Sequence, residues 1–70
     1  MGLIRYIDLF VLEGVCRQIG EWLKKGWKPF PISLNYSRKT ILEEDILEET
    51  NRIVESYGIP KDLVEIEITE

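Results

Sequence analysis

The chain has 70 residues, enough for one small domain with a modest hydrophobic core. It contains no histidine and one cysteine, which excludes a histidine-based catalytic triad, a histidine- or thiolate-ligated zinc site and an internal disulfide within these residues. Nine basic and thirteen acidic residues give a net charge of −4, and the basic residues cluster only at Lys24, Lys25 and Lys28. We therefore expect no binding to DNA or RNA, which needs a basic face.

No segment is long and apolar enough to span a bilayer, and the first residues lack the regions of a signal peptide. We therefore expect no membrane contact within these residues and a cytoplasmic location. Cys16 lies in an apolar helical stripe, which favours a buried thiol in a reducing compartment.

A long amphipathic helix is predicted over residues 4–25, because apolar residues recur there at spacings of three and four. The stripe consists of Ile4, Ile7, Val11, Val15, Ile19, Trp22 and Leu23, and it is widened by Phe10, Leu12 and Cys16. Lys24, Lys25 and Gly26 then form a typical helix C-terminus, since cations favour the negative end of the helix dipole and glycine is common just beyond it.

Polar and apolar residues alternate in the next segment, and we expect a strand over residues 30–36. Successive side chains of a strand point to opposite faces. One face would carry Ile32, Leu34 and Tyr36, and the other would carry Ser33 and Asn35.

A second helix is expected between residues 40 and 57. Its apolar stripe would consist of Leu42, Ile46, Ile53, Val54 and Tyr57. Thr40 followed by Glu43 fits a capping box, whereas the acidic residues 43–45 fit a helix that begins a few residues later, at the positive end of its dipole. We interpret the acidic residues as a solvated helix start and not as a metal site. Gly58 and Pro60 end the helix.

The second strand is expected from about residue 63 onward. One face would carry Val64, Ile66 and Ile68, and the other Glu65, Glu67 and Thr69. A strand, a crossover helix and a further strand favour a parallel pair. If the strands are adjacent, Asn35 and Glu67 would offer an amide oxygen and a carboxylate side by side to a hard divalent cation such as Mg²⁺. The alternative interpretation is an ordinary two-faced sheet with one side in water.

The element order indicates α/β architecture. A strand buried on both faces of an open parallel sheet reads as a continuous apolar run, and neither strand does. A (β/α)₈ barrel packs outward faces on helices and places its active site at the carboxyl ends of the strands. Asn35 and Glu67 stand late in their strands. The pattern therefore favours a helix-strand-helix-strand piece of a TIM-type (β/α)₈ barrel with parallel strands.

Three stretches, in order and in spacing, resemble the EAL-domain cyclic-di-GMP phosphodiesterases, a bacterial signal-transduction family folded as a modified TIM barrel. Residues 7–22 are similar to the long helix that follows the family's name motif. Residues 32–38, Ile-Ser-Leu-Asn-Tyr-Ser-Arg, are similar to its "SVNLS" strand, although Tyr36 replaces the commoner leucine. Residues 57–70 combine Tyr-Gly-Ile-Pro with Leu-Val-Glu-Ile-Glu-Ile-Thr-Glu and resemble its "LELEITE" strand.

The resemblance implies roles for three positions. Asn35 and Glu67 match ligands of a catalytic Mg²⁺ or Mn²⁺ ion, and Glu70 matches a glutamate that holds a neighbouring active-site loop. The implied reaction is hydrolysis of one phosphodiester bond of cyclic di-GMP to linear pGpG, in which two metal ions activate water and stabilise charge on the phosphate. No substrate-binding residue is implied.

The sequence contains neither a Glu-Ala-Leu motif nor an Asp-Asp-Phe-Gly segment, both of which belong to the family's active site. Because a TIM barrel takes about 250 residues, we expect residues 1–70 to be a partial EAL domain that holds the second and third barrel strands with their preceding helices. We expect this piece to be inactive alone and to self-associate through open strand edges.

Two other functions stay open. One is a degenerate, non-catalytic EAL-type module that binds the nucleotide or a protein partner, and a Glu-Ala-Leu motif with second-metal aspartates in the parent protein would argue against it. The other is a small acidic α/β interaction protein whose resemblance is fortuitous. That reading predicts that Asn35→Ala and Glu67→Ala leave every activity of the parent intact.

Overall fold

The computed structural model describes residues 3–69. Its elements, in chain order, are α1 (Leu3–Lys24), β1 (Ile32–Ser37), α2 (Arg38–Ile41), α3 (Ile46–Ser56), the 3₁₀ turn η1 (Lys61–Leu63) and β2 (Val64–Thr69). The expected helix-strand-helix-strand order is therefore confirmed, with α2 as an additional short helix. Within residues 3–69, no helix combines the length and the apolar character needed to cross a membrane.

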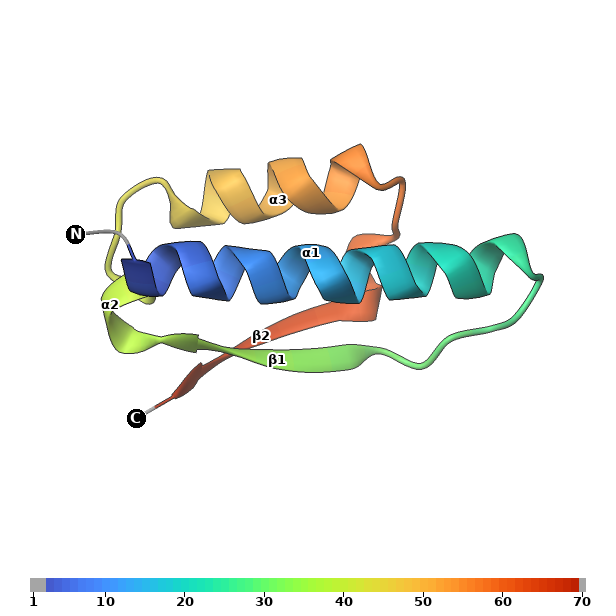
Figure 1. Cartoon of the computed structure of the whole chain (residues 1–70), viewed down its shortest axis with the longest axis horizontal. Coiled ribbons are helices and arrows are strands. Elements are labelled where there is room, and N and C mark those ends of the chain that lie inside the picture. Colours follow the sequence, from blue (N-terminus) through green and yellow to red (C-terminus); the bar gives the residue numbers. More distant parts are fainter. Residues whose placement is uncertain (1–2, 70) are drawn as a thin grey trace.

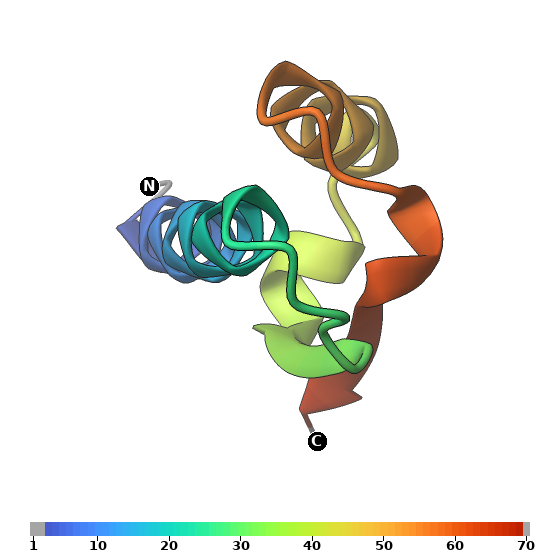
Figure 2. The same cartoon turned by 90° about the vertical axis from the view of Figure 1, so that its right-hand side faces the viewer.

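The two strands pair in parallel, from Ile32 opposite Val64 to Ser37 opposite Thr69. Helices α1 and α3 lie on the same side of this pair, as the two views in Figure 1 and Figure 2 agree. The opposite side of the sheet carries no element of the described chain. The predicted α/β class with parallel strands is thus confirmed.

The core lies between the sheet and the two helices. It consists of Leu12, Cys16 and Ile19 of α1, Leu34 and Tyr36 of β1, Ile46, Ile53 and Val54 of α3, and Ile59 beyond α3. The three residues of α1 are separated by four and three positions, so they fall on one helix face. Cys16 is fully buried, as expected, and this burial raises the pKa of its thiol.

Both long helices end in the same kind of turn. Gly26 and Gly58 have φ angles of 79° and 68°, in the left-handed region that glycine adopts without a steric penalty. The residue after each glycine donates its backbone N–H to a carbonyl five residues earlier, Trp27 to Trp22 at 3.0 Å and Ile59 to Val54 at 3.4 Å. These are Schellman turns, and they confirm the two predicted helix ends.

Of the two starts that the sequence left open for the second helix, the later one, after the acidic residues 43–45, is confirmed, and a start capped by Thr40 is wrong. The chain instead forms α2, leaves helical geometry over residues 42–45 and starts α3 at Ile46. Thr40 is not an N-cap. It is buried inside α2, and Ser37 caps that helix by accepting a hydrogen bond from the Thr40 backbone N–H at 3.2 Å. Asp45 precedes α3 without any side-chain capping bond, because its carboxylate is bound elsewhere.

Candidate metal centre

The sheet has two chemically different faces. Leu34 and Tyr36 of β1 point into the core, with 7% and 1% of their surface exposed. The alternate residues Ser33 and Asn35 are exposed on the other face. The pleat of the strand explains this difference, since it directs every second side chain away from the helices.

Asn35 and Glu67 are direct partners in the parallel register. Each is the fourth residue of a six-residue strand, and each is exposed on the face that the helices leave uncovered. Neighbouring strands lie about 4.8 Å apart, so one small cation can reach side-chain oxygens of both residues. The adjacency predicted from the sequence is therefore present in the fold, whereas the ligand roles remain a prediction.

A comparison with the preceding pair shows that these oxygens are available. Ser33 and Glu65 also face each other in the register, and the Ser33 hydroxyl donates to the Glu65 carboxylate at 3.1 Å. Within residues 3–69, no side-chain hydrogen bond or ion pair engages Asn35 or Glu67. An amide oxygen and a carboxylate without competing partners suit a hard divalent cation.

Asn35 and Glu67 together offer side-chain oxygens from only two residues. Within the described chain, no group of three or more histidine, cysteine, aspartate or glutamate side chains could hold a metal ion. Mg²⁺ is often bound through one or two carboxylates while it keeps several waters. The residues present therefore fit a partial Mg²⁺ or Mn²⁺ site.

The end of β1 that follows Asn35 is held by the first turns of α1. The Ser37 backbone N–H donates to the Asp8 carboxylate at 2.9 Å. Arg5 binds Asp45 through two hydrogen bonds of 2.7 and 3.0 Å and also pairs with Glu43. Hydrogen bonds to Asp45 and Glu43 raise the pKa of Arg5 above its ordinary value, and the Arg5 hydrogen bond lowers the pKa of Asp45 below the ordinary aspartate value.

Sequence reasoning missed these contacts. The acidic residues 43–45 do precede a helix, as expected, but two of them bind Arg5 about forty positions away. One local signal was present at Asp8, which is four positions before the buried Leu12 and so shares its helix face. A charged residue on a buried face usually has a specific partner.

Tyr36 is a second feature that the sequence did not reveal. Its ring stands where the similar strand of the EAL-domain family more commonly has leucine. Its hydroxyl lies 2.9 Å from the Thr50 hydroxyl inside the core. Burial raises the pKa of Tyr36 above its ordinary value. The larger residue is therefore accommodated by a polar partner on α3, which satisfies both buried hydroxyl groups.

Glu70, the predicted loop-holding glutamate, lies outside the described residues. Its role stays a prediction.

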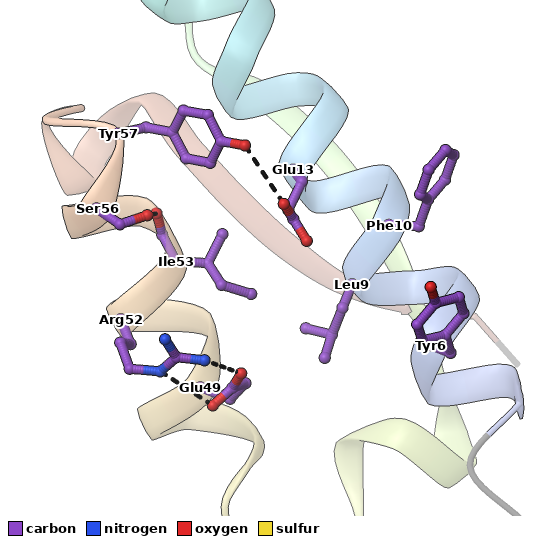
Figure 3. A pocket seen from close by; sticks show the side chains of 9 residues that line it. All are labelled: Tyr6, Leu9, Phe10, Glu13, Glu49, Arg52, Ile53, Ser56 and Tyr57. Atoms are coloured by element: carbon purple, nitrogen blue, oxygen red, sulfur yellow. Dashed lines mark hydrogen bonds and ion pairs between the residues drawn. The ribbon is translucent and has the colours of Figure 1, made fainter.

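A separate groove of about 450 Å³ lies between α1 and α3 (Figure 3), and none of its lining residues belongs to β1 or β2. Its lining comes from Tyr6, Leu9, Phe10 and Glu13 on one side and from Glu49, Arg52, Ile53, Ser56 and Tyr57 on the other. The polar groups bind one another: Tyr57 donates to Glu13 at 3.3 Å, and Arg52 pairs with Glu49. The groove therefore offers no charged group aimed at a ligand.

The sequence of the chain identifies the protein family to which it belongs. The sequence model of the EAL domain matches residues 1–70, the whole chain. The chain belongs to the EAL domain family. This family is known as the cyclic-di-GMP phosphodiesterase domain and folds as a TIM-type barrel, which agrees with the parallel helix-strand arrangement.

Known relatives are considerably longer than this chain. It is 28% identical over 69 residues to the signaling protein YkoW of Bacillus subtilis and 30% identical over 70 residues to the uncharacterized protein Rv1357c of Mycobacterium tuberculosis. Each alignment covers 99% of this chain but only 8% of YkoW and 23% of Rv1357c. No solved structure matches the chain.

Proposed function

We propose that this chain contributes two ligands, Asn35 and Glu67, to the metal centre of a cyclic-di-GMP phosphodiesterase domain. The observation that carries the proposal is the in-register pairing of these residues on the uncovered face of a parallel sheet. The EAL family match over the whole chain gives this pairing its chemical meaning. The reaction is hydrolysis of one phosphodiester bond to give linear pGpG.

Electrostatics support a cation at this position. Glu65 and Glu67 both lie on the open face, and a cyclic dinucleotide carries negative phosphates. Without a cation, carboxylates and phosphates would repel each other. When bound, Mg²⁺ or Mn²⁺ supplies charge neutralisation at the phosphate and lowers the pKa of water. In this scheme Asn35 and Glu67 hold the ion, and Glu70 holds a neighbouring loop.

We infer that these residues do not hydrolyse the substrate alone. Two oxygen donors leave most of a Mg²⁺ coordination shell to water, and a two-metal mechanism needs a second site. The proposed role of the chain is therefore to supply the second and third strands, with their preceding helices, to a larger barrel.

The expected self-association of the isolated chain remains part of this proposal. Each strand has one unpaired edge in the described sheet, and such edges recruit further strands. Several large apolar side chains are at least 70% exposed, namely Leu3, Tyr6, Phe10, Phe30, Leu42 and Leu47. Neighbouring units of a barrel, or copies of the chain, would cover them.

The cytoplasmic location and the absence of nucleic-acid binding also stay predictions.

A segment exchange tests the proposal. The 70 residues replace the homologous segment of a catalytically active EAL domain, and cyclic-di-GMP hydrolysis is measured with Mg²⁺ and with Mn²⁺. We expect activity in the exchanged protein. We expect Asn35→Ala and Glu67→Gln to lower it at least about 100-fold, since even groups that only hydrogen-bond to metal ligands are worth about 10- to 100-fold.

The chain offers its own matched controls. Ser33→Ala and Glu65→Gln change the preceding pair on the same face, and we expect activity within about threefold of the unsubstituted exchange protein. Binding of cyclic di-GMP without hydrolysis would favour the non-catalytic module. Equal losses in both pairs would contradict the assignment of Asn35 and Glu67 as ligands. If the exchanged protein does not fold, Mn²⁺ binding is measured on the 70-residue chain instead. Loss of Mn²⁺ binding in the Asn35→Ala variant would then support the assignment of Asn35 as a ligand.

A further inference from the structure

The segment that follows the metal strand is fixed to α1 at both of its ends. Before α2, the Ser37 backbone N–H donates to Asp8 at 2.9 Å. After α2, Asp45 binds Arg5 at 2.7 and 3.0 Å. Arg5 and Asp8 are three positions apart, so they lie on neighbouring turns of one helix face. The first turns of α1 therefore bracket the whole of α2.

Asp8 is well suited to hold a backbone group in place. Four residues further along α1, Leu12 is fully buried in the core. The helix is thereby anchored, and a carboxylate on its inner face has little freedom to move. Its bond partner is the peptide of Ser37, the last residue of β1 and only two positions beyond Asn35.

We propose that Asp8 is a positioning residue for the metal ligand Asn35, an inference that rests on the proposed function. The Asp8 carboxylate fixes the end of β1 through the Ser37 peptide. This keeps Asn35 in register with Glu67 at the point where the chain turns into α2. Groups that orient metal ligands are worth about 10- to 100-fold in metal affinity. Asp8 would therefore influence the ion without touching it.

The test measures Mn²⁺ binding to the 70-residue chain from the loss of the free-ion electron paramagnetic resonance signal. We expect Asp8→Ala to raise the dissociation constant about tenfold. Asp8→Asn should stay close to the unsubstituted chain, because its amide oxygen can still accept the Ser37 N–H. If Asp8→Asn weakens binding as much as Asp8→Ala, the effect is one of charge, and the positioning role is overturned.

Glu13→Ala is the matched control. Glu13 is also a half-buried carboxylate of α1, and it accepts a hydrogen bond from Tyr57, beyond α3, instead of one from β1. A purely structural effect would lower the melting temperature in both alanine variants and leave Mn²⁺ affinity per folded molecule unchanged in both. A positioning role predicts that only Asp8→Ala changes the affinity.

A second measurement needs no variant. Coupling between two sites is reciprocal, so saturating Mg²⁺ should slow hydrogen exchange of the Ser37 amide in the unsubstituted chain by about tenfold. Unchanged exchange would overturn the inference even if Asp8→Ala fails to fold. If the unsubstituted chain binds no Mn²⁺, or if Asn35→Ala binds it equally well, the proposed metal centre fails instead. The two failures are therefore distinguishable.

Discussion

The two faces of the β1–β2 sheet are made by alternate residues of the same two strands, yet different forces act on them. On the helix-covered face, Leu34 and Tyr36 are almost fully buried, and their identity is set by packing. On the open face, Asn35 and Glu67 are exposed and have no side-chain partner within residues 3–69. Because different residues serve stability and the proposed metal binding, substitutions on the covered face should alter folding, and substitutions on the open face should alter metal binding.

The largest expected effect is on the covered side. Leu12→Ala should destabilise the chain by about 3 kcal/mol, because it leaves a cavity in a fully buried position. Asn35→Ala on the open face should change the free energy of unfolding by less than about 0.5 kcal/mol. Urea denaturation followed by circular dichroism measures both. A control, Leu47→Ala, removes the same atoms from a side chain that is 73% exposed and should resemble Asn35→Ala. Similar losses of stability in all three variants would mean that the covered and open faces do not differ in their contribution to folding.

A smaller effect is expected from the buried hydroxyl pair. Tyr36→Phe keeps the ring but leaves the Thr50 hydroxyl without its partner at 2.9 Å, at an expected cost of about 1–2 kcal/mol. Tyr6→Phe is the control, since Tyr6 is 71% exposed. Thermal unfolding compares the two. An unchanged melting temperature for Tyr36→Phe would mean that the hydroxyl pair contributes nothing beyond the packing of the ring.

The smallest effect concerns the ion pairs that Arg5 forms with Glu43 and Asp45, after α2. Because Arg5 lowers the pKa of Asp45 in the folded chain, this contribution is complete above the unfolded-state pKa of aspartate and disappears as the pH falls through the folded-state pKa. Arg5→Gln should therefore lower the melting temperature near neutral pH, and the difference should shrink in acid. The effect should also weaken in about 1 M salt, since these groups are partly exposed. A difference that does not depend on pH would assign the role of Arg5 to packing of its stem.

Local pattern was sufficient for the features that depend on neighbouring residues. Alternation in the strands predicted which side chains face the helices, and Gly26 and Gly58 predicted where the long helices end. The pairing of Asn35 with Glu67 followed from the parallel crossover. The break over residues 42–45 agrees with the later of the two helix starts, whereas the contacts of Arg5 with Glu43 and Asp45 could not be predicted, because these partners lie about forty positions apart in the chain. Asp8 was missed for the same reason, since its partner is a backbone group that has no sequence signature.

The Schellman turns after Gly26 and Gly58 have an evolutionary consequence. Backbone hydrogen bonds hold both turns, so selection there preserves one glycine in each turn and, after Gly58, the core residue Ile59. At the opposite end of the sheet, Arg5 and Asp45 must be inherited together for their side-chain contact to survive. Sequence drift should therefore be rapid in the loops at one end of the sheet and correlated between distant positions at the other.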